Sequence, residues 1–236
     1  MTQPANYDHI PTQNLFVSIC GLIGAGKSTL ATALGKHLNV PVYYEPVEEN
    51  VYLEDFYTDM KKYGFAMQIY LFTKRFSQHQ TIIWSGKSAV QDRSIYEDTI
   101  FAKVLMKQGN MTERDYGTYL EMFRQCSNFL KHPNLLIYLD VSPEEAVERI
   151  KSRSRNCESS IPIEYLQELY NEYQIFIDDI SKRIPVIKVK WDKFHTADEV
   201  ALNILNEYKK QKRIIEVDFS TNIEVDEKDG FGAWFF

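Results

Sequence analysis

The sequence contains few cysteines, no long apolar run and no excess of basic residues, and each absence excludes a class of protein. Its three cysteines, Cys20, Cys126 and Cys157, lack the C-x-x-C spacing of metal or redox sites, so we expect free thiols in a reducing compartment and neither zinc nor disulfides. No apolar segment approaches the ~20 residues of a membrane-spanning helix, which predicts no membrane partner. A formal net charge of −6 argues against a nucleic-acid partner.

The chain is long enough for one large domain, since it has 236 residues of which 44% are hydrophobic. Its first fourteen residues are polar and include two prolines, which does not resemble a signal peptide and makes a cytoplasmic location the expectation. Helical periodicity fades after Arg213. We therefore predict one domain over residues 1–213 and an appended tail over residues 214–236, which ends in an unusually aromatic segment.

Five short apolar segments alternate with longer segments of helical periodicity. They are residues 15–20, 40–45, 88–92, 134–140 and 184–189. Such alternation predicts an α/β fold, with a five-stranded parallel sheet flanked by helices. After the fourth segment, Ser142 followed by Pro143 indicates the start of a helix with the serine as its N-cap.

A phosphate-binding motif follows the first apolar segment. Residues 21–28 match G-x-x-x-x-G-K-[ST] between a strand-like and a helix-like segment. Glycines let backbone N–H groups turn toward an anion, and the start of the following helix adds its dipole. We therefore predict a bound nucleoside triphosphate, with Lys27 on its terminal phosphates and the Ser28 hydroxyl on Mg²⁺. The predicted nucleotide contacts of this loop are Gly21, Leu22, Ile23, Gly24, Ala25, Gly26, Lys27, Ser28 and Thr29.

Charged residues end three of the other predicted strands. Because the carboxyl ends of parallel strands meet at one edge of a sheet, Glu45, Asp92 and Arg93 should converge near the phosphates. Glu45, expected on the strand next to the phosphate-loop strand, is predicted to be the general base for an acceptor hydroxyl. Asp92 is predicted to orient Mg²⁺, directly or through water, and Arg93 to clamp phosphate. The alternative for each is a helix cap or an exposed strand end, and for Asp140 we expect a cap or turn.

A second basic cluster comprises Arg149, Arg153 and Arg155. The first two lie four residues apart and so share one face of a helix, just before a break in the periodicity. They could belong to an arginine-rich lid that closes over the triphosphate and excludes water. Cations at the negative end of a helix dipole explain the same residues equally well, and both interpretations stay open.

Together these residues resemble the deoxynucleoside kinase family over residues 16–194. The motifs that carry the resemblance are the phosphate loop, Glu45-Pro46-Val47, Gln68 with Arg75, Asp92-Arg93-Ser94 with Asp98, and the arginine cluster. The resemblance implies a P-loop kinase fold with an arginine-rich lid. It implies that Glu45 is the general base for the 5′-hydroxyl, and it agrees with catalytic roles for Lys27 and Arg93.

The resemblance also implies a nucleoside pocket. Gln68 would bind the base edge, and Arg75 with Asp98 would form a charge pair that reads the exocyclic groups. The other implied contacts are Phe101 stacked on the base, Tyr57 and Glu158 on the 3′-hydroxyl, and Arg149, Arg153 and Arg155 in the lid. A charge pair leaves no apolar space for a thymine methyl group. The resemblance therefore implies deoxyadenosine or deoxyguanosine as the favoured substrate, with deoxycytidine as the third candidate.

The implied activity is transfer of a phosphoryl group from ATP, with Mg²⁺, to the 5′-hydroxyl of a deoxynucleoside in nucleotide salvage, by a cytoplasmic homodimer. One alternative is a nucleoside monophosphate kinase similar to thymidylate kinase, but Glu45 on the acceptor side favours an uncharged hydroxyl over a phosphate. The other is a nucleotide-sensing module without catalysis, which the presence of Lys27, Ser28 and Arg93 disfavours.

Overall fold

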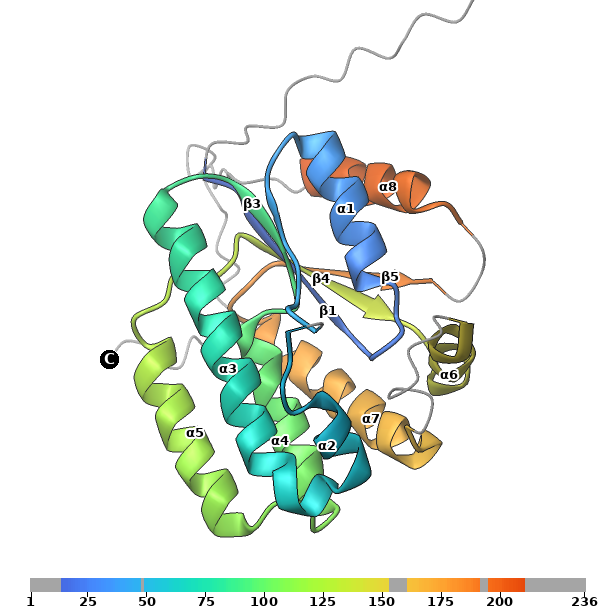
Figure 1. Cartoon of the computed structure of the whole chain (residues 1–236). Coiled ribbons are helices and arrows are strands. Elements are labelled where there is room, and N and C mark those ends of the chain that lie inside the picture. Colours follow the sequence, from blue (N-terminus) through green and yellow to red (C-terminus); the bar gives the residue numbers. More distant parts are fainter. Residues whose placement is uncertain (1–13, 48, 153–160, 192–194, 211–236) are drawn as a thin grey trace, which may run out of the picture.

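The computed structural model describes residues 14–47, 49–152, 161–191 and 195–210 (Figure 1). The strands are β1 (Phe16–Gly21), β2 (Val42–Tyr43), β3 (Ala89–Asp92), β4 (Leu135–Asp140) and β5 (Val186–Lys190). The helices are α1 (Lys27–Leu38), α2 (Leu53–Thr58), α3 (Met60–Ser85), α4 (Asp98–Lys107), α5 (Glu113–Ser127), α6 (Pro143–Ser152), α7 (Ile163–Ile180) and α8 (Ala197–Lys210), with a 3-10 turn at Ile95–Glu97.

The strands form one parallel sheet in the order β2-β3-β1-β4-β5, which confirms the predicted α/β fold. Figure 1 shows α1 and α8 on one face of the sheet, and α3, α4 and α7 on the other. The three interior strands β3, β1 and β4 are buried along their whole length, because helices cover both faces of the sheet. Burial on both sides is most visible in the sequence at β1 and β4. This explains why both appear in the sequence as unbroken apolar segments.

The strand order corrects one prediction about Glu45. β3 lies between β2 and β1, so the segment that leads to Glu45 is not adjacent to the phosphate-loop strand. β2 is also shorter than predicted, since it spans two residues at the edge of the sheet and ends at Tyr43. Pro41 and Pro46 flank it, and proline has no N–H group to extend the hydrogen-bonded ladder. Glu45 therefore lies in the loop beyond the strand.

Two further sequence predictions concern the end of β4. Ser142 accepts a hydrogen bond from the Glu145 N–H group at 3.3 Å, which confirms it as the N-cap of α6. The expected capping or turn role of Asp140 is wrong, because its carboxylate lies 3.2 Å from Lys188 Nζ and so links β4 to β5. Lys188 is on the neighbouring strand, and sequence spacing could not indicate that contact.

Within the described ranges, no helix has both the length and the apolar character that a membrane crossing requires. Cys20 and Cys126 are free thiols, as predicted, whereas Cys157 lies outside the described residues. The predicted tail over residues 214–236 also lies outside them.

Candidate active site

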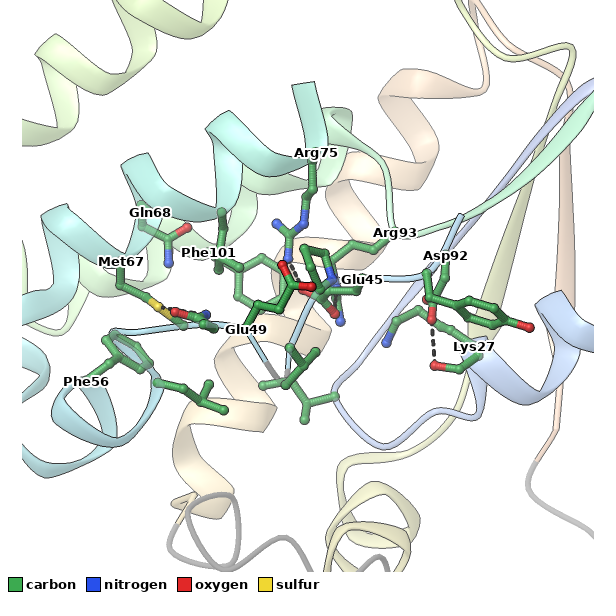
Figure 2. A pocket seen from close by; sticks show the side chains of 18 of the residues that line it. Lys27, Glu45, Glu49, Phe56, Met67, Gln68, Arg75, Asp92, Arg93 and Phe101 are labelled. Carbon is green, nitrogen blue, oxygen red and sulfur yellow. Dashed lines mark hydrogen bonds and ion pairs between the residues drawn. The ribbon is translucent and has the colours of Figure 1, made fainter. Parts of the chain in front are cut away.

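A cavity of about 440 Å³ opens at the carboxyl ends of β1, β2 and β3. It is lined by residues from the phosphate loop, the loop after β2, α2, α3 and the start of α4. The predicted site residues that line it are Ile23, Gly24, Lys27, Ser28, Glu45, Tyr57, Gln68, Arg75, Asp92, Arg93 and Phe101. Figure 2 shows Gln68 toward one end, Lys27 and Asp92 toward the other, and Glu45 between them.

The phosphate loop needs its glycines at specific positions. Gly24 and Gly26 have φ angles of 82° and 93°, a region that residues with a Cβ atom rarely occupy. A Cβ on Gly24 would also lie 2.7 Å from the carbonyl oxygen of Ala146 in α6. The loop leads directly into α1, which begins at Lys27. The unpaired N–H groups of this helix start therefore lie beside the loop, as an anion site requires.

Lys27 is directed into the loop. Its Nζ atom donates hydrogen bonds to the carbonyl oxygens of Gly21, at 3.2 Å, and Leu22, at 2.7 Å. Burial, and then the charge of Arg93, lower the pKa of Lys27 to about 8. The amine is therefore still charged at neutral pH, and an anion in the loop would favour its charged form.

Two oxygen atoms at the mouth of the loop fit a magnesium ion. The Ser28 hydroxyl donates to Asp92 Oδ2 at 2.5 Å, and Asp92 Oδ1 has no hydrogen-bond partner within the described part of the chain. Mg²⁺ prefers oxygen ligands and is commonly held by one or two carboxylates together with substrate phosphates. No cluster of three or more metal-binding side chains occurs among the described residues, so phosphates and water would supply the other ligands.

Glu45 lies between two arginines. Its Oε2 atom accepts from Arg93 Nε at 3.2 Å, and its Oε1 atom accepts from Arg75 Nη2. Burial, the largest single effect, would raise the pKa of Glu45. The charges of Arg75, Arg93 and Lys27 together outweigh burial and hold the pKa well below its usual range. The carboxylate is therefore ionised, and it is a weak base while both ion pairs persist.

At the base end, Gln68 and Arg75 line the cavity, whereas Asp98 contacts Arg75 and is not itself among the lining residues. Arg75 Nη1 contacts Asp98 Oδ1, and both side chains are almost completely buried. Gln68 and Arg75 are seven residues apart on α3 and so face the cavity together. Gln68 Oε1, Asp98 Oδ2 and Arg75 Nε have no hydrogen-bond partner among the described residues. Buried polar atoms without a partner are costly, so these three atoms favour a polar ligand.

Phe101 and Tyr57 line the same cavity. The Phe101 ring lies 4.8 Å from the centre of the Arg93 guanidinium, so it supports that side chain in this structure. The contacts expected of both residues with a nucleoside stay predictions.

Arg149 lies beside the phosphate loop. Its Nη1 atom donates to the carbonyl oxygen of Ala25 at 3.2 Å, its Nε atom to Glu145 at 2.7 Å, and its Nη2 atom to the carbonyl oxygen of Trp191. All three nitrogens thus bind protein groups here, and a contact with the triphosphate stays a prediction. Arg153, Arg155 and Glu158, the rest of the predicted lid and a predicted sugar contact, lie outside the described residues.

Two buried residues beside the cavity, Glu97 and Tyr173, were missed by the sequence analysis. Glu97 is 0% exposed, and its Oε2 atom accepts from Arg93 Nη1 at 3.0 Å and from the Gly21 N–H group at 3.4 Å. The Tyr173 hydroxyl contacts Glu97 and lies 2.9 Å from Arg93 Nη1. The spacing of Ser94 and Glu97 is that of a capping box, a signal that points to helix capping and not to Arg93.

A sequence model of one family, described as "Deoxynucleoside kinase", matches residues 17–213. The chain belongs to the deoxynucleoside kinase family. Among curated relatives of this kinase, a deoxyadenosine kinase of Dictyostelium discoideum is 50% identical over 215 residues, covering 91% of this chain and 88% of the relative. A deoxyadenosine/deoxycytidine kinase of Bacillus subtilis is 39% identical over 185 residues, covering 77% and 84%.

The solved structures most similar to the kinase include deoxyadenosine kinase from M. mycoides. With bound dCTP, that structure has a TM-score of 0.73 and 36% identity, covering 82% of this chain and 100% of the other. With bound dATP, the TM-score is 0.73 and the identity 34%, covering 81% and 99%. The family assignment decides against the monophosphate kinase and sensing-module alternatives.

Proposed function

We propose that this deoxynucleoside kinase transfers the γ-phosphoryl group of ATP to the 5′-hydroxyl of a purine deoxynucleoside, with deoxyadenosine preferred. The observation that argues against thymidine is the pair of buried acceptor atoms without partners among the described residues, Gln68 Oε1 and Asp98 Oδ2. An exocyclic amino group, which adenine, guanine and cytosine have and thymine lacks, donates two hydrogen bonds and would satisfy both. The similarity to deoxyadenosine kinases supports the choice of deoxyadenosine.

The mechanism assigns one proton transfer to the chain. Glu45 accepts the proton of the 5′-hydroxyl as its oxygen forms a bond to the γ-phosphorus, and the bond to the bridging oxygen breaks with its electron pair left on ADP. Lys27 and Arg93 face the charge that develops on the transferred group. Mg²⁺, held by Ser28 and Asp92, would neutralise phosphate charge when bound.

Nucleoside binding also explains how Glu45 could become a better base. Arg75 contacts both Glu45 and Asp98, so one guanidinium links the proposed catalytic carboxylate to the carboxylate proposed to read the base. A base that engages Arg75 and Asp98 would compete with the contact between Arg75 and Glu45. Weakening that contact raises the pKa of Glu45 toward a more useful value for proton abstraction.

Steady-state assays across the four deoxynucleosides, with ATP and Mg²⁺, test the proposal. We expect the highest kcat/KM for deoxyadenosine and a value about 10⁴-fold lower for thymidine, because a site that hydrogen-bonds an amino group rejects an analogue without one. Thymidine turned over as well as deoxyadenosine would overturn the base assignment. Phosphorylation of dAMP or dTMP, but of no nucleoside, would overturn the acceptor assignment.

Family membership also supports two further parts of the proposal, a homodimer and a cytoplasmic location. Light scattering during gel filtration tests the first, with a mass of twice 27.7 kDa expected. Fractionation of the source cells tests the second.

A further inference from the structure

We propose that Glu97 is a positioning residue for phosphoryl transfer. Its carboxylate contacts both Arg93 and Gly21, the first residue of the phosphate loop, and so fixes the position of one relative to the other. This role rests on the proposed function, in which Arg93 faces the transferred phosphoryl group. Glu97 would act only through its neighbours, since it does not line the cavity.

Arg93 is held by two carboxylates that differ in their exposure. Glu45 reaches its Nε atom from the cavity, and its side chain is 17% exposed, whereas Glu97 reaches Nη1 from the buried side and is 0% exposed. During the reaction Glu45 must turn toward the 5′-hydroxyl and become protonated, which weakens its pair with Arg93. Glu97 accepts no proton in the reaction, so it is the anchor that persists.

The backbone of Arg93 also depends on this anchor. Its φ angle is 67°, in the left-handed region, which costs a residue other than glycine about 1–3 kcal/mol. The Arg93 side chain offsets that cost by its contacts with Glu97, with the Tyr173 hydroxyl at 2.9 Å and with the ring of Phe101. These contacts fix the direction of the guanidinium before substrate binds.

The same oxygen of Glu97 contacts the donor side of the site. Oε2 accepts from the Gly21 N–H group at 3.4 Å, where β1 ends and the phosphate loop begins. Arg93 is at the end of the neighbouring strand, and its N–H group donates to the carbonyl oxygen of Ile19 at 2.9 Å. One buried carboxylate therefore links the end of β1 with the arginine after β3, and a shift of Glu97 would move the two relative to each other.

A purely structural role would leave a different signature. In that case Glu97 would serve only the capping box, in which its Oε1 atom accepts from the Ser94 N–H group at 3.1 Å. Capping needs neither Arg93 nor Gly21. Ser94→Ala removes the serine half of the box and leaves the contact between Glu97 and Arg93 in place, so it is the matched control.

The experiment is a double-mutant cycle on the full-length kinase. It combines Glu97→Gln with Arg93→Lys and uses the deoxynucleoside that the wild type converts with the highest kcat/KM. If the nucleobase preference proposed above is wrong, the assay uses a different deoxynucleoside, and the result expected for Glu97→Gln stays the same. We expect Glu97→Gln to lower kcat on the order of 100-fold, because a displacement of about 1 Å at the reacting groups has that effect. The KM for the nucleoside should change less than about threefold, since Glu97 does not touch it.

In the Arg93→Lys background, Glu97→Gln should lower kcat by less than about threefold more, because its effect passes through Arg93. Ser94→Ala should keep kcat while lowering Tm. The proposal would be overturned if kcat of the double variant fell by the product of the two single-variant factors. It would also be overturned if Glu97→Gln folded and kept a wild-type kcat.

A second variant decides the matter if Glu97→Gln does not fold. Tyr173→Phe keeps the buried ring and removes only the hydroxyl that contacts Glu97 and Arg93. We expect kcat to fall about 3- to 10-fold at unchanged KM. Its control is Tyr119→Phe, because the Tyr119 hydroxyl is also buried but has no partner in the described structure. Equal kcat values in these two variants would overturn the proposal.

Discussion

The buried contact between Arg75 and Asp98 leads to a thermodynamic prediction. Arg75 is 2% exposed and contacts two carboxylates, so Arg75→Met leaves Asp98 buried without a counter-charge and leaves Glu45 with Arg93. Removing one partner of a buried ion pair costs about 3–5 kcal/mol, whereas replacing both partners by apolar groups is often close to neutral. We therefore expect Arg75→Met to destabilise the kinase far more than Arg75→Met combined with Asp98→Ala.

The magnitude follows from the size of the chain. For 150–250 residues, each kcal/mol lowers Tm by about 2–4 °C, so Arg75→Met should lower Tm by roughly 6–20 °C. The double variant should lose less than about 2 kcal/mol of unfolding free energy. Part of that loss comes from Asp98 itself, whose carboxylate lies in the first turn of α4 and stabilises the helix dipole by about 0.3–1 kcal/mol.

The assay is urea and thermal unfolding followed by circular dichroism, at one protein concentration for all variants. Arg124→Met provides the matched control, because Arg124 is exposed on α5 and the same substitution there should change stability by less than about 0.5 kcal/mol. If the double variant loses as much as the two single variants together, Arg75 and Asp98 are not coupled. The reasoning about the base end of the cavity would then be wrong.

Further outcomes are expected at the phosphate end and at the catalytic base. Glu45→Gln should bind nucleoside with a normal Kd but lose about 10²- to 10⁴-fold in kcat, and near-normal turnover would remove Glu45 from the role of base. Because the pKa of Lys27 is about 8 and a bound phosphate favours the charged amine, the contribution of Lys27 should keep the Kd of ATP constant below that pKa and raise it up to tenfold per pH unit above it; calorimetry should show no such slope in Lys27→Met. Gly24→Ala should weaken ATP binding more than tenfold and cost about 1–3 kcal/mol, since its φ is 82° and the new Cβ would meet the carbonyl oxygen of Ala146; an unchanged Kd would contradict the loop geometry. Chelation of Mg²⁺ with EDTA should abolish turnover, and full activity in EDTA would contradict the role given to Ser28 and Asp92.

The sequence predicted the fold well because its signals are local. All five strands begin and end within two residues of the predicted segments. For β1 and β4, burial on both faces of the sheet produces a largely apolar segment that the sequence shows directly. β2 was overestimated because it is an edge strand between two prolines. The strand order was not predictable from periodicity. β3 pairs with both β1 and β2, and this placement depends on how α3, which precedes β3, packs against the sheet.

The site was predicted unevenly for a physical reason. Lys27, Arg75 and Arg93 stand in motifs whose spacing is set by one helix or one turn, so the sequence shows them together. Glu97 and Tyr173 are 76 residues apart in the chain, and their contact exists only after α7 packs beside the site. The packing of helices decides which side chains contact a catalytic group such as Arg93. A local sequence pattern does not indicate contacts between residues so far apart in the chain.

The balance of charge explains why the donor cannot bind through side chains alone. The buried or nearly buried charged groups around the cavity are the cations Lys27, Arg75 and Arg93 and the carboxylates Glu45, Asp92, Glu97 and Asp98. With every carboxylate ionised, these groups carry one more negative charge than positive charge, although burial raises the pKa of Glu97. A triphosphate adds several negative charges, and like charges at close range in a buried site are strongly unfavourable. We therefore expect the phosphate-loop N–H groups, the dipole of α1 and a divalent cation to supply most of the attraction. The affinity for ATP should then depend on Mg²⁺ more steeply than on any single lysine or arginine.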